Sequence, residues 1–432
     1  MSPWWHFNTA FVVKMNRETS AKSLLRRRSP VFRLSELYKV RLVVSASGER
    51  VPLLVDANSG LPLNRPNQFM LVTRRDRCQV STLSKELRIL GIVLGWASKT
   101  ALDLHALLDS GKGLDHAQVT SLVETLRCDF GDGAKDVIPM ARPVVAAATW
   151  AHRISVARDY VAWNLERALR AAEPGSLRYQ HISDVRRSLA QRMTDLMPKA
   201  RSASERRGLD ARLRGRLLEV LEPHSMENPF QKVMRSRNAL VIELMLATGL
   251  RRGEVLKIRT SDVSVGARAT LSIERRPDDP DDPRLYEPQV KTRGRKIPLD
   301  AVVASNLSKY ILDERRLLPN ARRSPFLFLS RSGRPLTLRG LDNIFAQILL
   351  RHPEFCGHLT PHVLRHTAND LLSEVFEQSG CTNDEAKEIR NHLMGWEPNS
   401  DQGVRYSRAH IERLAQMVSL DHQRRIFGKG GA

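Results

Sequence analysis

Six residues in the second half of this 432-residue chain constrain its fold most, because they can act together only if distant segments meet. Each has a side chain that binds phosphate or can react with it: Arg251, Lys291, His362, Arg365, Trp396 and Tyr406. Arginine and lysine are positively charged at neutral pH, and an indole N–H or an imidazole donates hydrogen bonds. A fold that gathers these residues would surround a phenol with positive charge and donors.

Such a set of groups suits the cleavage of a phosphodiester without a metal ion. The non-bridging oxygens carry negative charge that grows in the transition state, so donors must be aimed at them beforehand. A free phenol has a pKa of about 10, so roughly one in a thousand is ionised at neutral pH and its activation needs about 4 kcal/mol. His362 and the arginines are the candidates for this activation, and Lys291 is the candidate for protonating the leaving 5′ oxygen.

The segments around these residues resemble the sequence boxes of the tyrosine recombinases, also called phage-type integrases. Ala247-Thr-Gly-Leu-Arg-Arg-Gly-Glu-Val-Leu256 is similar to the first arginine box of the family, and Thr360-Pro-His-Val-Leu-Arg-His-Thr367 is similar to its H-x-x-R box. Residues 289–299 resemble the short β-hairpin that carries the family's lysine. Leu393-Met-Gly-Trp396 stands where family members have L-G-H or G-W. The resemblance covers residues 206–425, about half of the chain.

The resemblance implies a role for each of the six residues. Tyr406 would attack a DNA phosphorus, giving a 3′-phosphotyrosyl enzyme and a free 5′ hydroxyl. Lys291 would protonate the leaving oxygen. The other four would hold the phosphate or assist the phenol: Arg251, His362, Arg365 and Trp396. The resemblance implies no cofactor and no metal, and the ester would retain the bond energy needed to rejoin strands without ATP.

Three positions near the boxes need separate interpretation. Trp396 replaces the more common histidine, and its indole N–H can still donate to a phosphate oxygen. Glu254 matches the glutamate of the first box, and we expect it to be structural and to orient Arg251. His366 directly follows Arg365, so we expect it to face another side of the helix. The stretch between Arg365 and Trp396 is longer than is usual for the family.

Length and composition agree with a protein of several domains that binds a polyanion. A chain of 432 residues exceeds one ordinary domain, and 41% hydrophobic residues allow each domain a buried core. The net charge of +22 favours nucleic acid as partner, because Lys and Arg contacts to phosphates release counterions. Charge alone would equally allow RNA or acidic lipid. The cysteines lack the C-x-x-C spacing of a zinc site: Cys78, Cys128, Cys356 and Cys381.

Apolar patterning gives no sign of a membrane segment in this sequence. No apolar run approaches the roughly 18 residues needed to span a bilayer. The opening Met1-Ser-Pro-Trp-Trp-His-Phe7 lacks the basic start and apolar core of a signal peptide. We therefore expect a soluble cytoplasmic protein, associated with the nucleoid and without a membrane partner.

The first half of the chain predicts a helical domain preceded by an extension. Residues 1–66 form the extension, with short strands expected at residues 40–44 and 51–55. Residues 67–200 are expected to be helical, because apolar residues recur three and four positions apart in two runs: Leu83, Leu87, Leu90 and Leu94, then Ile154, Ala157, Val161 and Leu165. Its place ahead of the boxes corresponds to the family's core-binding domain, which clamps DNA. Residues 108–142 are expected to be an irregular or loosely helical insertion between the helices.

The second half predicts a catalytic domain at residues 206–425, reached through a basic linker at residues 198–208 and followed by a tail at residues 426–432. Thr360 followed by Pro361 predicts a helix start, with the threonine as cap. Near the carboxyl end an apolar stripe completes the domain's own core or docks on a neighbouring protomer: Ile411, Leu414, Met417 and Val418. The predicted fold class is therefore mainly α with a small hairpin or three-stranded sheet.

Around the first box the local signals are more detailed. Asn238 is expected to cap a helix that ends near Gly249. Strands are expected at residues 269–273 and 287–291, on either side of an acidic, proline-rich loop. A tight turn follows, and its flexible tip would let Lys291 reach into a groove.

These inferences predict an enzyme that breaks and rejoins DNA in the site-specific recombination of a mobile element. The resemblance implies a homo-tetramer that gathers two double-stranded DNA sites and forms a Holliday junction, with accessory DNA-bending proteins as further partners. A type IB topoisomerase would use the same chemistry as a monomer, and a catalytically silent DNA-binding protein could share the fold. A relaxase would require a metal held by an H-x-H arrangement, which this sequence lacks.

Overall fold

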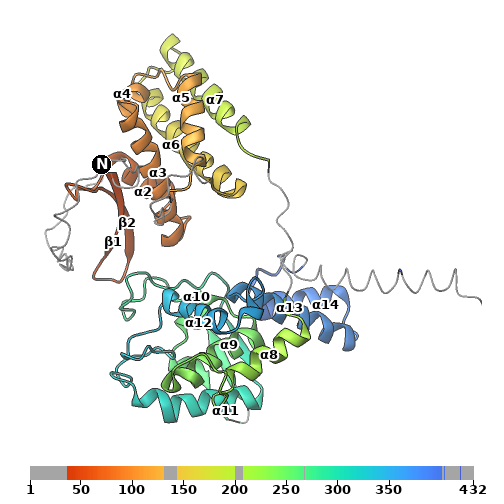
Figure 1. Cartoon of the computed structure of the whole chain (residues 1–432). Coiled ribbons are helices and arrows are strands. Elements are labelled where there is room, and N and C mark those ends of the chain that lie inside the picture. Colours follow the sequence, from red (N-terminus) through yellow and green to blue (C-terminus); the bar gives the residue numbers. More distant parts are fainter. Residues whose placement is uncertain are drawn as a thin grey trace, which may run out of the picture. The chain divides into compact units, whose positions relative to one another are not determined.

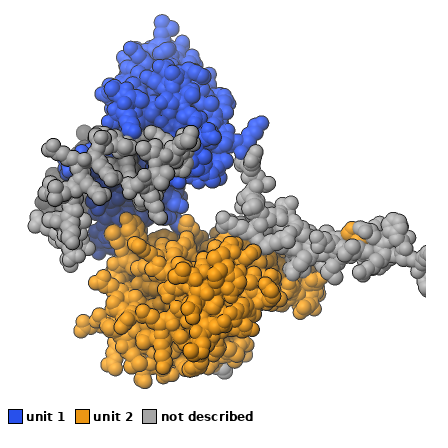
Figure 2. All heavy atoms as spheres, viewed as in Figure 1, with its two compact units in different colours: residues 1–203 blue, residues 204–432 orange. Residues whose placement is uncertain are grey.

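The computed structural model describes residues 37–130, 144–199, 208–266 and 268–400, together with Gly403 and Ser419. The chain divides into two compact units, residues 1–203 and residues 204–432 (Figures 1 and 2). Helices dominate both units, and the described strands form one two-stranded and one three-stranded sheet. The predicted fold class, mainly α with small sheets, is confirmed.

The first unit begins with a β-hairpin. Strands β1 (Tyr38–Val44) and β2 (Arg50–Asp56) pair antiparallel, which confirms the two strands predicted from their apolar runs. The turn between them uses Gly48, whose φ of +87° glycine adopts without strain. Leu54 of β2 is buried against helix α3 (Val80–Lys99), so the hairpin shares the core of the helices that follow it (Figure 1).

Helices form the rest of the first unit. Besides α3 they are α2 (Asn64–Thr73), α4 (Leu104–Asp109), α5 (His116–Arg127), α6 (Ala147–Arg170) and α7 (Leu177–Asp195). All eight residues of the two predicted apolar stripes are buried, in α3 and in α6. The stripes therefore face the common core, as a helical period of about 3.6 residues requires.

Helix α5 lies in the predicted irregular or loosely helical insertion, and the helical alternative holds here. Asp115 starts this helix with a capping box: its carboxylate accepts from the backbone N of Gln118, and the Gln118 side chain accepts from the backbone N of Asp115. Leu122 and Leu126 are then buried one turn apart. The glycines nearby suggested irregularity, but the cap and the apolar spacing decide the local structure. Residues 131–143 of the predicted insertion lie outside the described residues.

The second unit is built around one central helix. Helix α9 (Arg235–Thr248) is buried on nearly all sides, as expected for a helix that is apolar all round. Its neighbours are α8 (Ala211–Leu221), α10 (Arg252–Lys257), α11 (Ala301–Lys309) and α13 (Pro361–Gln378). The unit also contains α12 (Leu338–Arg351), α14 (Asn383–Met394), a π-turn at Tyr310–Glu314 and four short 3-10 turns: Lys232–Met234, Thr260–Asp262, Arg315–Leu317 and Pro353–Phe355.

For α9, the predicted start is wrong and the predicted end is confirmed. Asn238 does not cap the helix, because α9 already begins at Arg235 and Asn238 is buried inside it, where its Oδ1 accepts from the Arg237 guanidinium. The end at Gly249 is confirmed: this glycine has φ of +64°, and its N donates to the carbonyl of Met245 at 3.0 Å.

A three-stranded antiparallel sheet lies beside these helices, in the order β3 (Val263–Ser264), β4 (Thr270–Ile273) and β5 (Arg295–Pro298). The strand predicted at residues 269–273 is confirmed as β4. The strand predicted at residues 287–291 is wrong, because β4 pairs with β5 and residues 287–291 take an irregular path.

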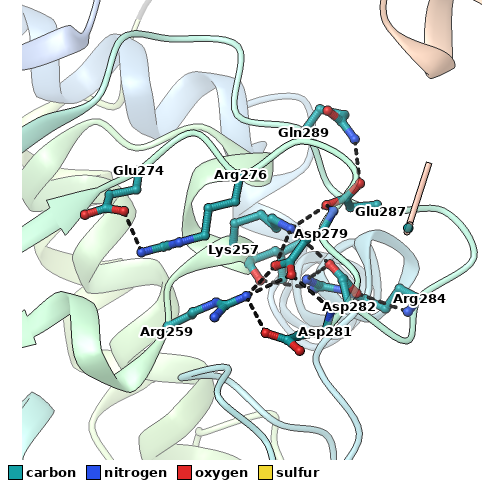
Figure 3. Close-up of polar contacts among 12 residues, drawn as sticks. Lys257, Arg259, Glu274, Arg276, Asp279, Asp281, Asp282, Arg284, Glu287 and Gln289 are labelled. Carbon is teal, nitrogen blue, oxygen red and sulfur yellow. Dashed lines mark hydrogen bonds and ion pairs between the residues drawn. The ribbon is translucent and has the colours of Figure 1, made fainter. Parts of the chain in front are cut away.

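Ion pairs fold the acidic segment between β4 and β5 (Figure 3). The side chain of Lys257, at the end of α10, is 2% exposed, and its Nζ donates to Asp279 at 3.1 Å, Asp282 at 3.3 Å and Glu287 at 2.5 Å. Arg259 adds hydrogen bonds of 2.8 Å to the Asp279 carboxylate. A buried charge is tolerated only when it is paired, so the segment must wrap around the lysine.

We predict that Lys257→Met will destabilise the second unit by about 3–5 kcal/mol, because it leaves three buried carboxylates without their shared cation. Urea unfolding followed by circular dichroism measures the change. Lys296→Met is the matched control, since Lys296 is an exposed lysine on β5 and its loss should have little effect. Equal stability of the two variants would contradict the interpretation.

Acid should weaken the same region. Burial would raise the pKa of Asp282, but the Arg284 guanidinium and Lys257 outweigh burial and hold that pKa below its ordinary value. A folded-state pKa below the unfolded value of about 3.9 contributes stability that is present above that pH and is lost as pH falls through the folded value. We predict that the urea midpoint falls as pH drops below about 4, and that Asp282→Asn makes the fall shallower. An unchanged pH dependence in Asp282→Asn would contradict this.

Candidate active site

The first box places Arg251 at the start of α10, directly after the turn that ends α9. The backbone N of Arg251 donates to Glu254 Oε2 at 2.7 Å, and Nη1 of its guanidinium lies 3.9 Å from Glu254 Oε1. The Arg251 side chain is 29% exposed, whereas the Glu254 side chain is fully buried. Glu254 therefore caps the helix and orients Arg251, in the structural role expected for it.

Glu254 also lies at the centre of a buried polar cluster. Its carboxylate accepts from the Thr292 hydroxyl and from Arg295, at 3.1 Å for Nη1 and 3.3 Å for Nη2. Nε of Arg295 donates to the carbonyl of Leu393 at 2.7 Å. Burial opposes ionisation of Glu254, but the Arg295 guanidinium outweighs it and holds the pKa of Glu254 below its ordinary value. Arg295 thus connects α10, β5 and the end of α14.

The H-x-x-R box forms the first turns of α13. Thr360 caps this helix by accepting from the backbone N of Val363 at 3.2 Å, and Pro361 takes the first helical position, which confirms the predicted helix start. Arg365 is 1% exposed. Its Nη1 donates to the carbonyl of Gly249 at 2.5 Å and its Nη2 to the carbonyl of Met394 at 3.0 Å. One guanidinium therefore links the ends of α9 and α14.

Trp396 follows the glycine that ends α14. Its ring lies 5.3 Å from the Arg365 guanidinium carbon, and the side chain is buried. Gly395 has φ of +66°, and a Cβ there would lie 2.5 Å from Arg295 Nη1 and 2.8 Å from Thr292 Cβ. The glycine is therefore needed both for its backbone angle and for the close approach of residues 292–295.

Lys291 lies in a segment that is packed against α10, so the expectation that it sits at a flexible hairpin tip is wrong. Its side chain is exposed, while Val290 and Thr292 on either side are buried. The carbonyl oxygen of Gln289 passes so close to α10 that a Cβ on Gly253 would lie 2.1 Å from it. The backbone before and after Lys291 is thus held against α10 at Gly253 and Glu254.

His362 and His366 are in direct contact at the start of α13. Their Nε2 atoms are 3.2 Å apart, and the ring centroids are 4.5 Å apart with an interplanar angle of 79°. The expectation that His366 faces another side of the helix is wrong, because residues four apart are neighbours on a helix surface. His362 is exposed and His366 is half-buried.

Tyr406 lies outside the described residues, as do the four residues of the predicted terminal stripe and most of the predicted linker. Gly403, three positions before Tyr406 in the sequence, is described and buried. A Cβ on Gly403 would lie 3.3 Å from Arg390 Cδ and 3.7 Å from Trp396 Cζ3. The chain therefore passes the indole of Trp396 shortly before the predicted nucleophile.

The structure brings the boxes together at one place in the second unit. Arg365 donates to the carbonyls of Gly249, in the first box, and Met394, two residues before Trp396. Thr292, the residue after Lys291, donates to Glu254 of the first box. Sequence reasoning missed Arg295, Thr292 and His366 as parts of this place. The signal for Arg295 was the alternation of β5, in which residues 295 and 297 are buried and residues 296 and 298 are exposed.

Comparison with known proteins supports the resemblance of these boxes to those of the tyrosine recombinases. The model of the phage integrase family matches residues 217–392. Tyrosine recombinase XerC of Bacillus licheniformis is 29% identical over 189 residues, which cover 41% of this chain and 55% of that protein. XerC of Mycobacterium tuberculosis is 26% identical over 269 residues, which cover 62% of this chain and 74% of that protein. Residues 217–392 therefore match the phage integrase family, and the chain is similar to tyrosine recombinases.

The family match contains four of the six predicted site residues, Arg251, Lys291, His362 and Arg365, and it ends before Trp396 and Tyr406. This chain spans about half the length of the Bacillus recombinase in that match. Among solved structures, the post-cleavage complex of the XerH site-specific recombinase with a palindromic difH substrate is 16% identical, with a TM-score of 0.40, over 79% of this chain and 88% of that one.

The residues that the structure describes contain neither a membrane-spanning helix nor a metal-binding cluster. No helix there is long and apolar enough to cross a membrane. No three His, Cys, Asp or Glu side chains in that part of the chain converge to hold a metal ion. Its four cysteines are free thiols.

We predict that Gly253→Ala will displace the segment that carries Lys291, because the new Cβ would lie 2.1 Å from a backbone oxygen that cannot rotate away. The expected cost is about 1–3 kcal/mol, measured by urea unfolding, together with slower DNA cleavage. Gly215→Ala in α8 is the control: its Cβ would meet no atom within 4 Å, and the change should be neutral or stabilise the helix by up to about 1 kcal/mol. Parental stability and cleavage in Gly253→Ala would contradict the proposed packing.

Proposed function

We propose that this protein is a site-specific DNA recombinase that cleaves and rejoins DNA through Tyr406. The observation that carries the proposal is the guanidinium of Arg365, which binds the carbonyls of Gly249 and Met394 and lies against Trp396. These contacts unite three sequence boxes that are far apart in the chain. The match of residues 217–392 to the phage integrase family and the net charge of +22 support DNA as the partner.

The exposures of the cations support a division of labour in the proposed site. Arg251 and Lys291 reach solvent, so they are the side chains proposed to meet the scissile phosphate directly. Arg365 is buried and bound to backbone carbonyls. It is therefore proposed to hold the site together and to supply positive charge from the buried side of the site. Trp396 is proposed to pack beside the phosphate and to present its indole N–H.

The proposed reaction is a phosphoryl transfer in which atoms and charge balance. The Tyr406 hydroxyl loses its proton to His362, and its oxygen forms a bond to the DNA phosphorus. The bond from phosphorus to the 5′ oxygen breaks, and Lys291 gives that oxygen a proton. A 5′ hydroxyl from another strand then reverses the attack and releases the enzyme. Preorganised cations stabilise the charge that develops on the phosphate oxygens.

Finer features of the function are proposed with this reaction. Residues 67–200 of the first unit are proposed as the DNA-clamping core-binding domain, and residues 206–425 of the second unit as the catalytic domain. A groove between α6 and α7 would accept phosphates, because it is lined by arginines: Arg158, Arg186 and Arg187. Four protomers on two duplexes would form a Holliday junction and integrate, excise or resolve a mobile element in the cytoplasm, with accessory bending proteins.

We predict that the parent protein forms a covalent adduct with a nicked suicide DNA carrying the element's own end, in the presence of EDTA, and that Tyr406→Phe forms none. The phenylalanine lacks the oxygen that attacks phosphorus. Gel electrophoresis after denaturation measures the adduct. Tyr286→Phe is the control, because Tyr286 is 61% exposed and lies in the acidic segment.

An equal adduct from Tyr406→Phe and the parent would contradict the assignment of the nucleophile. Relaxation of supercoiled DNA by dilute protein, without paired sites, would favour a type IB topoisomerase instead. Absence of any adduct from the parent on its own element's end would favour a silent DNA-binding protein.

A further inference from the structure

One carboxylate in the candidate site lies between two arginines from different elements. Glu254 Oε1 is 3.1 Å from Arg295 Nη1, and Glu254 Oε2 is 3.3 Å from Arg295 Nη2, so the guanidinium on β5 meets both oxygens as a fork. Nη1 of Arg251 lies 3.9 Å from Glu254 Oε1. The charge of the carboxylate is therefore matched more closely by Arg295, although Arg251 is its nearer neighbour along the chain.

Burial strengthens the pairing of Glu254 with Arg295. The Glu254 side chain is fully buried and that of Arg295 is 1% exposed, whereas that of Arg251 is 29% exposed. Charges attract more strongly where water does not screen them, and a buried carboxylate without a cation is costly. Burial opposes ionisation of Glu254, but Arg295 outweighs burial and keeps the pKa of this carboxyl below its ordinary value. Glu254 is therefore charged at neutral pH and needs a cation beside it.

The contacts of Arg295 show that it acts inside the protein. Its Nε donates to the carbonyl of Leu393 at 2.7 Å, and its Nη1 also donates to the Thr292 hydroxyl at 3.3 Å. With the two bonds to Glu254, all three guanidinium nitrogens bind protein groups. A Cβ on Gly395 would lie 2.5 Å from Nη1, so the backbone also packs against this group. Any effect of Arg295 on the reaction must therefore pass through the residues that it binds.

Loss of Arg295 would change the surroundings of Arg251. The buried carboxylate would then draw the Arg251 guanidinium from 3.9 Å into a close, forked ion pair, because an arginine matches both oxygens of a carboxylate. Arginine binds a phosphate with the same N–H groups in the same forked geometry. A carboxylate and a phosphate would thus compete for Arg251, and Arg295 removes the carboxylate from that competition.

We propose that Arg295 is a positioning residue for DNA cleavage, because it neutralises Glu254 and so keeps Arg251 directed to the scissile phosphate. The inference rests on the function proposed above, in which Arg251 meets that phosphate. Glu254 keeps two bonds that shape the site, one from the backbone N of Arg251 and one from the Thr292 hydroxyl. Its charge is balanced by Arg295.

A neutral pair in place of the charged pair tests this role. We expect Arg295→Met to slow single-turnover cleavage of the suicide DNA, at saturating protein, by about tenfold or more, within the roughly 10²–10³-fold that loss of one transition-state donor costs. Adding Glu254→Gln should restore the rate to within about threefold of the parent, because the amide keeps an oxygen for the backbone N of Arg251 and carries no charge. Loss of packing or of the bond to Leu393 would not be repaired by this second change.

Arg315→Met is the matched control for the loss of a buried arginine. Arg315 is 6% exposed and donates to backbone carbonyls within residues 321–327, which are not part of the candidate site. Its loss should lower the urea midpoint but leave the cleavage rate of the folded protein near that of the parent. The control therefore separates lower stability from slower cleavage.

Three results would each overturn the proposal: a parental rate in Arg295→Met, no recovery when Glu254→Gln is added, or equal slowing in Arg315→Met. If Arg295→Met does not fold, Arg295→Lys and the double variant carry the test, because neither leaves a carboxylate charge unmatched. A loss of more than about tenfold in either would then overturn the proposal, since one lost transition-state donor costs roughly that much or more.

The same measurements distinguish this inference from the proposed function. An adduct from the parent together with a parental rate in Arg295→Met would overturn the positioning role alone. Absence of an adduct from the parent would overturn the proposed function and, with it, the positioning role.

Discussion

The ion pair between Glu254 and Arg295 is the interaction on which the site depends most. Both side chains are buried, and a buried charge without its partner costs several kcal/mol, so neither residue can be lost alone. The same carboxylate caps α10 at Arg251 and accepts from Thr292, while the same guanidinium binds the carbonyl of Leu393. The first box, the sheet and the glycine–tryptophan box are therefore held in one arrangement by two charged residues.

Cations serve two different purposes in this protein. Lys257, Arg295 and Arg365 are buried and bind carboxylates or carbonyls, so they determine the path of the chain. Arg251 and Lys291 are accessible, so they are the groups proposed for phosphate. The number of basic residues therefore overstates the cations available to bind phosphate, because part of the basic content acts as internal structure.

Local signals predicted much of the fold because they depend on nearby residues. The apolar period identified α3 and α6, and Thr360 with Pro361 identified the start of α13. The same reasoning failed at residues 287–291, where a short strand-like run is drawn into the ion pairs around Lys257 instead of pairing with β4. It also failed at His366, because the prediction considered only the adjacent Arg365 and not His362, which lies one helical turn away.

The sequence by itself determined the resemblance to the tyrosine recombinases, the order of the six predicted site residues, and the helices α3, α6 and α13, because boxes, caps and apolar periods depend on nearby positions. Only the tertiary structure decided that Arg295 joins three segments, that Lys257 organises the acidic loop and that residues 289–292 pack over Gly253. These contacts join residues that are far apart in the chain. Their existence depends on the complete path of the backbone and on the need to pair every buried charge, which no local pattern records.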